Sequence, residues 1–242
     1  QYRYLIKRAD YFLAISESAK RDLMSLFDIP GNKIDVVYCG VSENMRPVTD
    51  HESQEALYKR YNLPEKYILF VGNFNPRKNL ERIIKAFDKV KEKGITHKLV
   101  IAGGEGWKFD KQNSLKDVTY KEDILFLSYI PDDDMPVLYS CADLFLFPTL
   151  YEGFGIPILE AQACGIPVLT SRCSAMPEIG GQGALYVDPT NIDEICKGIL
   201  SIINDSNLAA KLTQNGFENI KRFSWATSAQ KLNEILEKVT NR

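Results

Sequence analysis

The sequence predicts an α/β protein with a doubly wound parallel sheet, preceded by the tail of a second α/β domain. Short runs of apolar, β-branched or aromatic residues alternate with longer amphipathic segments of helical periodicity. This alternation is typical of βαβ units, which place helices on both faces of a parallel sheet. Of the 242 residues, 45% are hydrophobic and 26% are charged, which is enough apolar material for a sizeable core.

Eight of the apolar runs are expected to form strands. In chain order they span residues 11–15, 34–38, 67–71, 99–102, 124–127, 144–147, 168–170 and 185–187. The runs between Tyr67 and Val187 number six and are separated by amphipathic segments. Six parallel strands are sufficient for one complete doubly wound domain, so we place the main sheet in this part of the chain.

Several helices have clear sequence signals. Residues 79–93 carry their apolar side chains on one face and stop at Gly94. Asn191 begins a pattern that resembles a capping box and opens the helix after the last strand. Residues 18–27 and 224–239 are predicted to be helices before and after the main domain.

The first 45 residues do not fit inside the main domain. Their two strands and one helix read as the tail of another α/β domain, and a polar stretch over residues 42–53 follows as a hinge or linker. The predicted organisation is therefore an N-terminal domain tail (1–45), a ligand-binding domain (46–223) and a C-terminal crossover helix (224–242). Because the chain starts within a helical pattern, we expect it to be a fragment of a longer protein.

Charge and cysteine usage exclude several classes of protein. The formal net charge is −2, which argues against nucleic-acid binding. The cysteines show no CxxC spacing, which argues against a disulfide framework or a zinc site and favours free thiols in a reducing cytosol; they are Cys39, Cys141, Cys164, Cys173 and Cys196. We expect a cytoplasmic protein, and the lysine-rich run over residues 85–98 would allow peripheral contact with anionic lipid at the inner membrane surface.

A candidate anion site follows the strand at residues 67–71. In open parallel sheets, ligands bind beyond the carboxyl ends of the strands. Asn75 and Pro76 are typical of a helix start, so Arg77 and Lys78 are expected in the first helical turn, where cations oppose the helix macrodipole. A bound anion would reverse that cost, so we predict a phosphate site; two solvated surface cations are the alternative.

A second candidate loop follows the strand at residues 144–147. Gly153 and Gly155 are expected to form a turn that a ligand can approach closely. Pro157 suits the first helical position and Gly165 suits the C-terminal cap. The spacing predicts a helix of about two turns whose positive end faces the strand tips.

Two carboxylates flank this helix end. Glu152 lies on the loop before the helix, and Glu160 is expected in the first helical turn. Carboxylates accept hydrogen bonds from sugar hydroxyl groups, and helix ends bind phosphates. The combination predicts a nucleotide sugar as ligand. A glutamate that stabilises its own helix would account for Glu160 alone but not for the whole run.

The run Glu-Gly-Phe-Gly-Ile-Pro-Ile-Leu-Glu, from Glu152 to Glu160, is similar to the double-glutamate motif of the group 1 retaining glycosyltransferases, which have the GT-B fold. Residues 72–79 resemble the phosphate loop of that family. Residues 99–106 resemble its next strand and turn, and residues 177–189 resemble its closing segment. The resemblance covers nearly the whole chain, from about Asp10 to Trp225.

The resemblance implies a role for each matching residue. In such enzymes the C-terminal domain binds the nucleotide-sugar donor, and the N-terminal domain binds the acceptor, a glycan or a lipid-linked glycan. The implied donor-phosphate residues are Gly72, Asn73, Arg77, Lys78 and the backbone amides near Phe154, Gly155 and Ile156. The base and ribose would lie at Tyr129, Ile130 and Glu160. The implied catalytic residues are Glu160 and Glu152, which would contact the donor sugar. The resemblance implies transfer with retention from a GDP- or UDP-linked donor, without a bound metal or cofactor.

The sequence departs from the family pattern in two places. Many members have arginine after the loop glycine where this chain has Asn73; Arg77 beside Lys78 is expected to take its place, as in a subgroup associated with mannosyl transfer to cell-surface polysaccharides. The family also uses a histidine of the N-terminal domain near the donor sugar. His51 and His97 are in the wrong places for that role and are expected to be exposed.

Two other patterns are not taken as functional sites. The run 132–134 of aspartates is expected to cap the following helix rather than to bind a metal. The glycines at 103, 104 and 106 lack the spacing of a dinucleotide fingerprint, which weakens a nicotinamide oxidoreductase. Two alternatives to a transferase are kept: a nucleotide-sugar epimerase on the same fold and a non-catalytic nucleotide-sugar-binding module.

Overall fold

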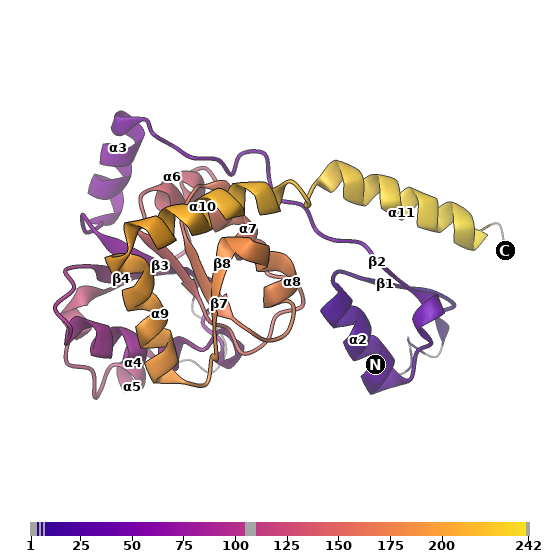
Figure 1. Ribbon diagram of the computed structural model, residues 1–242, viewed down its shortest axis with the longest axis horizontal. Coiled ribbons are helices and arrows are strands. Elements are labelled where there is room, and N and C mark those ends of the chain that lie inside the picture. Colours follow the sequence, from indigo (N-terminus) through magenta and orange to yellow (C-terminus); the bar gives the residue numbers. More distant parts are fainter. Residues whose placement is uncertain (1–3, 5, 7, 105–109, 241–242) are drawn as a thin grey trace.

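The computed structural model describes residues 4, 6, 8–104 and 110–240 and contains two parallel sheets (Figure 1). The larger sheet has six strands. In spatial order they are β5 (Ile124–Leu127), β4 (Lys98–Ala102), β3 (Tyr67–Val71), β6 (Leu144–Phe147), β7 (Val168–Ser171) and β8 (Ala184–Val187). All neighbouring pairs are parallel, so the predicted doubly wound sheet is confirmed.

All strands are parallel, but the chain adds them first on one side of β3 and then on the other. From β3 the chain moves outward to β4 and β5, then returns to β6 on the other side of β3 and moves outward again to β7 and β8. Right-handed crossovers therefore place helices on both faces of the sheet. The boundary between β3 and β6 is the topological switch point, where the loops after the two strands diverge and leave a crevice for ligands.

The helices form two layers around the sheet. Helix α4 (Leu80–Lys91) packs against α9 (Ile192–Asn204), while α7 (Ile156–Ala163) packs between α6 (Met135–Ser140) and α10 (Ser206–Ile220). As expected for a parallel sheet covered on both faces, the central strands β3 and β6 are almost entirely buried. The apolar face predicted for residues 79–93 is confirmed in α4, although this helix starts at Leu80 and ends at Lys91.

A smaller unit lies beside the main domain. Strands β1 (Phe12–Ala14) and β2 (Ile34–Val36) pair in parallel, and α2 (Glu17–Phe27) connects them. Helix α11 (Trp225–Thr240) runs from the main domain across this unit (Figure 1). Its Ser228 hydroxyl donates to the carbonyl oxygen of Tyr38, just after β2, and Lys238 Nζ lies 3.3 Å from Asp35 Oδ2 within β2.

The polar stretch after β2 is shorter than the sequence suggested. Residues 51–53 belong to α3 (His51–Tyr61), and Asp50 caps this helix by accepting a hydrogen bond from the Ser53 amide. The remaining short helices are α5 (Lys111–Ser114), α8 (Met176–Gly180) and 3-10 turns at Gly31–Lys33, Pro76–Lys78, Lys121–Asp123 and Gly181–Gly183. The capping interaction predicted at Asn191 is confirmed, since its side chain accepts from the Glu194 amide.

Two predictions about polar residues are wrong. His97 is only 8% exposed rather than solvated, and burial lowers the pKa of its imidazole. Asp134 precedes α6 but makes no capping hydrogen bond. Its carboxylate instead accepts from the side chains of Arg60 and Tyr61 on α3, which tie that helix to α6.

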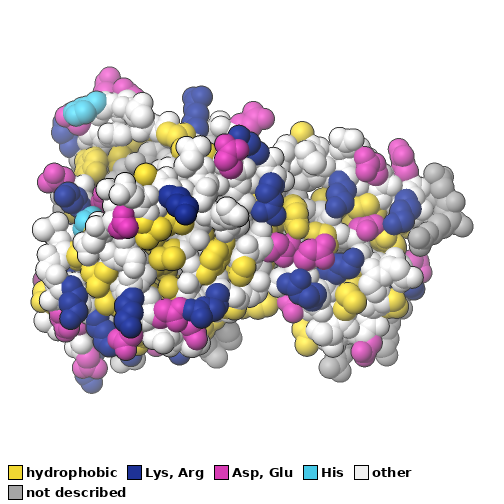
Figure 2. Space-filling model, viewed as in Figure 1, with side chains coloured by type: hydrophobic (Ala, Val, Ile, Leu, Met, Phe, Trp, Pro, Cys, Tyr) yellow, Lys and Arg dark blue, Asp and Glu magenta, His cyan; other side chains and the backbone are white. Residues whose placement is uncertain are grey.

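Neither a membrane span nor a metal cluster is found in the part of the chain that the structure describes. No helix there is long and apolar enough to cross a membrane, and no three His, Cys, Asp or Glu side chains gather around a point. The cysteines are all free thiols, and Cys164 and Cys196 are buried. On the face drawn in Figure 2, acidic and basic side chains are interspersed rather than gathered into a basic patch.

Candidate active site

The loops after β3 and β6 are joined at the switch point of the sheet. Asn79, 4% exposed, donates from its side-chain amide to the carbonyl oxygens of Pro148 and Pro189 at 2.8 and 2.7 Å. The Leu150 amide donates to the Arg77 carbonyl oxygen at 2.9 Å. These bonds bring the predicted phosphate loop and the loop of Glu152 into one structure.

Arg77 and Lys78 do not lie in the first turn of α4, as the sequence suggested. They belong to the 3-10 turn Pro76–Lys78, and Asn79 separates this turn from the helix with a left-handed backbone of φ 65°. Asparagine adopts that conformation more readily than most non-glycine residues, and here two buried amide hydrogen bonds hold it there. The turn therefore points its cations toward the β6 loop instead of along the helix axis.

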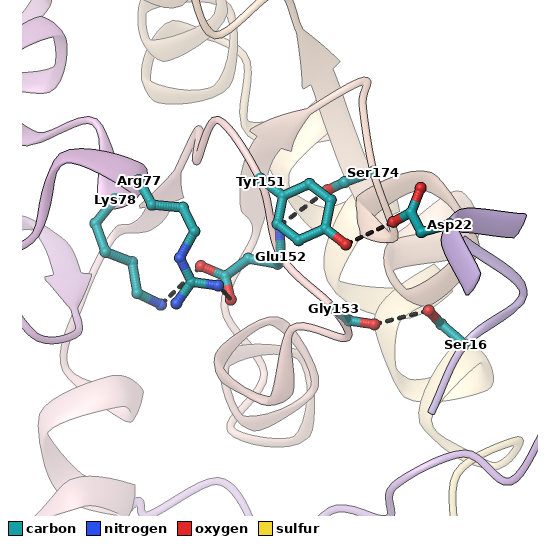
Figure 3. Close-up of polar contacts among 8 residues, drawn as sticks. All are labelled: Ser16, Asp22, Arg77, Lys78, Tyr151, Glu152, Gly153 and Ser174. Atoms are coloured by element: carbon teal, nitrogen blue, oxygen red, sulfur yellow. Dashed lines mark hydrogen bonds and ion pairs between the residues drawn. The ribbon is translucent and has the colours of Figure 1, made fainter. Parts of the chain in front are cut away.

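The two cations face the carboxylate of Glu152 (Figure 3). Lys78 Nζ lies 2.9 Å from Glu152 Oε1, and Arg77 lies 3.7 Å from Oε2. The side chains of Lys78 and Glu152 are 12% and 11% exposed, whereas that of Arg77 is 47% exposed. Lys78 Nζ also lies 4.6 Å from the centre of the Phe147 ring, which is a favourable cation–π distance. Three residues predicted as ligand contacts are thus brought together, as one ion-paired group.

Three buried polar atoms in these two loops have no hydrogen-bond partner among the described residues. They are Asn75 Oδ1, Thr149 Oγ1 and Glu152 Oε1, the last of which is close to Lys78 Nζ but outside hydrogen-bonding geometry. Buried polar atoms in folded proteins are almost always paired. A concentration of unpaired atoms at the switch point indicates a site for a polar ligand.

The backbone of the Glu152 loop is held by residues that the sequence analysis did not single out. The Glu152 amide donates to Ser174 Oγ at 3.1 Å, and Ser171 Oγ donates to the Thr149 carbonyl oxygen at 2.7 Å. The Cys173 thiol donates to the Leu150 carbonyl oxygen at 3.4 Å. The signal for these contacts was present, because small polar residues directly follow β7, whose carboxyl end lies beside that of β6.

The start of α7 has the geometry that the glycine pattern predicted. Gly155 has φ 116°, a backbone conformation that other residues rarely adopt. The helix begins at Ile156 without a side-chain cap; Pro157 has no amide hydrogen and the Ile158 amide donates to the Gly155 carbonyl oxygen, which leaves the Ile156 amide available to an anion. The Phe154 ring is buried against Tyr38 and Phe223, so only its backbone can reach a ligand.

Glu160 lies one turn further into the helix than expected. It is the fifth residue of α7, so it does not occupy the first turn. Tyr139 donates to Glu160 Oε2 at 2.9 Å. Burial raises the pKa of the Glu160 carboxyl above its ordinary value, and the Tyr139 hydrogen bond partly opposes that shift. Glu160 therefore remains a predicted ribose contact, whereas its expected place in the first helical turn is wrong.

At the end of β3, Gly72 packs closely against the neighbouring loop. A Cβ atom on Gly103 would lie 2.2 Å from the Gly72 carbonyl oxygen, and Gly103 has φ 148°, so the tight contact requires glycine there. Asn73 is exposed at the rim. Of the glycine-rich segment after β4, Gly106 lies outside the described residues.

A cavity of about 500 Å³ opens beyond β3, β4 and β5, a size suitable for part of a small ligand. Its lining residues are Phe74, Gly103, Gly104, Asp110, Lys111, Gln112, Phe126, Leu127 and Ser128. Tyr129, which follows Ser128, is 71% exposed, and Ile130 is buried at 5%. The cavity therefore lies next to the segment predicted to hold the base, although neither predicted residue lines it.

Comparison with known sequences identifies relatives along most of the chain. The sequence profile described as "Glycosyl transferases group 1" matches residues 54–219. O-antigen chain mannosyltransferase B from Escherichia coli is 33% identical over 219 residues, which cover 90% of this chain and 58% of that protein. The chain thus spans little more than half the length of this curated relative.

Solved structures show the same fold. Sucrose-phosphate synthase from Thermosynechococcus elongatus superposes with a TM-score of 0.83 and 22% identity, covering 99% of this chain and 61% of that protein. The Anabaena protein HepE in complex with UDP-glucose superposes with a TM-score of 0.85 and 20% identity, covering 97% of this chain and 66% of that protein. Both superpositions include the small unit as well as the six-stranded domain, since they cover nearly all of this chain.

Proposed function

Because the chain belongs to the group 1 glycosyl transferases, we propose that it is the donor-binding part of an enzyme that transfers a sugar from a nucleotide sugar with retention of configuration. The acceptor would be a glycan or a lipid-linked glycan. The observation that carries this proposal is the buried group at the switch point, where Lys78 and Arg77 face Glu152 beside the uncapped start of α7.

The chemistry of this group suits a diphosphate leaving group. Transfer breaks the bond between the anomeric carbon and the diphosphate, so negative charge grows on the diphosphate while the sugar gains oxocarbenium character. Lys78, Arg77 and the Ile156 amide of α7 are positioned to stabilise that negative charge. We propose that they do so without a bound metal or cofactor.

The two carboxylates would bind the hydroxyl groups of the donor. Glu152, next to the cations, is proposed to accept hydrogen bonds from the sugar, and Glu160 from the ribose. The base would lie near Tyr129 and Ile130, beside the cavity beyond β5. Residues 1–45 would belong to an acceptor-binding domain.

The donor is proposed to carry GDP or UDP. The mannosyltransferase relative favours a mannose conjugate as the first compound to test, and the HepE complex makes UDP-glucose the second. An epimerase on the same fold would isomerise the free donor, and a binding module would bind it without turnover by the full-length protein. The comparisons supply no epimerase among the relatives described above.

The direct test is calorimetric titration with GDP, UDP, ADP and their mannose or glucose conjugates. We expect one nucleotide to bind, more tightly as the diphosphate than as the monophosphate. The double substitution Arg77→Ala/Lys78→Ala should abolish measurable binding because it removes both cations. It should also lower the Tm, because the nearly buried carboxylate of Glu152 loses its partners.

A matched control removes the same charge elsewhere. Lys85 and Lys89 are exposed on α4, away from the β6 loop. The double substitution Lys85→Ala/Lys89→Ala should leave nucleotide affinity unchanged. Binding that survives the loss of Arg77 and Lys78 would refute the phosphate assignment.

A further inference from the structure

We propose that Glu152 acts as a specificity residue that disfavours the nucleoside diphosphate product relative to the nucleotide-sugar donor. Its carboxylate would compete with the terminal phosphate for Lys78, and it would be fully satisfied only when a sugar supplies hydroxyl donors. This inference rests on the proposed function of the same site. It adds a role in product release to the role of Glu152 as a sugar contact.

The competition follows from the contacts of the ligand-free site. Glu152 Oε1 lies 2.9 Å from Lys78 Nζ, and both side chains are nearly buried. Arg77, at 3.7 Å, reaches the other oxygen from a more exposed position. The carboxylate therefore occupies the partner that an incoming phosphate needs, in an environment where water screens charge poorly.

The backbone that carries Glu152 is fixed to neighbouring segments, which keeps this residue beside Lys78. The Glu152 amide is bonded to Ser174 Oγ, and two residues earlier the Leu150 amide is bonded to the Arg77 carbonyl oxygen. Both bonds tie the loop to neighbouring elements that lie on the same edge of the sheet. A phosphate bound to Lys78 would consequently sit beside the Glu152 charge.

One carboxylate oxygen would distinguish donor from product. Among the described residues, Glu152 Oε1 is ion-paired with Lys78 Nζ but accepts no hydrogen bond of good geometry. A sugar attached to the diphosphate offers hydroxyl groups that can donate to this oxygen. The nucleoside diphosphate offers none at that position, so the displaced carboxylate would be left buried and without a donor.

Charge acts in the same direction. The terminal phosphate of a nucleoside diphosphate is attached only through its anhydride bond and carries about −1.5 to −2 charges at neutral pH. In a nucleotide sugar the same phosphate is also esterified to the sugar and carries a single negative charge. Repulsion by Glu152 is therefore stronger for the product than for the donor, and the return of Glu152 to Lys78 would help to expel the product.

The test measures dissociation constants of the wild type and of Glu152→Gln for GDP, GDP-mannose, UDP and UDP-glucose. Glutamine keeps the size of the side chain but removes its charge. We expect the bound nucleoside diphosphate to bind roughly tenfold more tightly to the variant, equivalent to about 1.4 kcal/mol. The matching nucleotide sugar should change less, because lost repulsion is offset by weaker hydrogen bonds to the sugar.

Two further variants separate competition from general charge effects. Asp123→Asn breaks an ion pair of 2.8 Å with the nearly buried side chain of Lys91. Asp123 lies before the amino end of β5, far from the β6 loop. This variant should change the affinity neither for the nucleoside diphosphate nor for the nucleotide sugar. In a Lys78→Ala background, Glu152→Gln should tighten product binding less than in the wild type, because the contested partner is absent.

The possible results distinguish this inference from the proposed function. If the wild type binds a nucleoside diphosphate and Glu152→Gln binds it equally well or more weakly, the inference is overturned and the donor site stands. No binding by either protein would overturn both. Tighter binding of the diphosphate by the variant, with a smaller change for the sugar conjugate, is the result that supports the role of Glu152 in product release.

Discussion

The six-stranded domain and the small β1–β2 unit differ sharply in how they are stabilised. The large domain buries a continuous apolar core between its sheet and both helix layers. Among the described residues, the small unit buries Ala14, Ile29, Ile34 and Val36 in a separate cluster. Such a small core cannot offset the conformational entropy of folding by itself. The small unit is therefore stable only through its contacts with the rest of the chain.

Those contacts are largely polar and converge on the candidate site. The carboxylate of Glu178 accepts from the amides of Glu17 and Ser18 at the start of α2, at 2.7 and 3.0 Å. Ser16 Oγ donates to the carbonyl oxygen of Gly153, next to Glu152 (Figure 3). The small unit thus lacks a large core but holds the loop on which the site depends.

One aromatic residue connects the two regions. Tyr38 packs against Phe154 and Phe223 of the main domain, with ring centres 6.1 and 5.5 Å away. Burial and the neighbouring Glu178 carboxylate raise the pKa of Tyr38 to about 12. The hydroxyl therefore stays protonated at neutral pH and can serve as a donor beside Glu178.

The largest expected effect comes from the two cores themselves. Phe87 is fully buried in the main domain, and Phe87→Ala should lower its free energy of unfolding by about 3–5 kcal/mol. Ile34→Ala, at 1% exposure in the small unit, should leave that transition nearly unchanged and accelerate hydrogen exchange only in β1, β2 and α2. Urea titration combined with hydrogen-exchange mass spectrometry measures both. An equal loss of global stability in the two variants would mean that the units unfold together.

An intermediate effect is expected where the regions meet. Glu178→Gln removes the charge that accepts two amides at the start of α2, which should lower the local stability of this helix by about 1–2 kcal/mol. Exchange of the α2 amides should accelerate while β3 stays protected. Glu218→Gln, which loses only a surface pair with Lys221, is the control and should change neither. Unaltered α2 protection in Glu178→Gln would show that the polar contacts do not hold the small unit.

The smallest effect concerns Glu160 and depends on pH. Burial raises its pKa above the ordinary value of 4.5, so the folded state favours the protonated form. That contribution to stability is present below the ordinary pKa and is lost as pH rises through the raised value. Glu160→Gln should therefore have a higher Tm than the wild type at pH 7, and the difference should shrink toward pH 4. A constant difference in Tm across this range would contradict the assigned shift.

Local sequence patterns were sufficient for much of the fold because they report short-range physics. Strand boundaries in the large sheet were predicted within one residue, since parallel strands buried on both faces need continuous apolar runs. The apolar face of α4, the cap at Asn191 and the turn at Gly155 were predicted for the same reason. Each depends on residues within a few positions of one another.

What the sequence alone determined was the fold class, the strand order along the chain and the residue types gathered near the carboxyl ends of β3 and β6. Only the tertiary structure decided which of these side chains pair with one another. The side-chain amide of Asn79 donates to the carbonyl oxygens of Pro148 and Pro189, which lie far along the chain. These bonds hold Asn79 in its left-handed conformation and place Lys78 beside Glu152. His97 became buried, and Asp134 bonded α3 instead of capping α6, for a related reason. A polar side chain takes the partners that folding brings within reach, and those partners have no fixed spacing in the sequence.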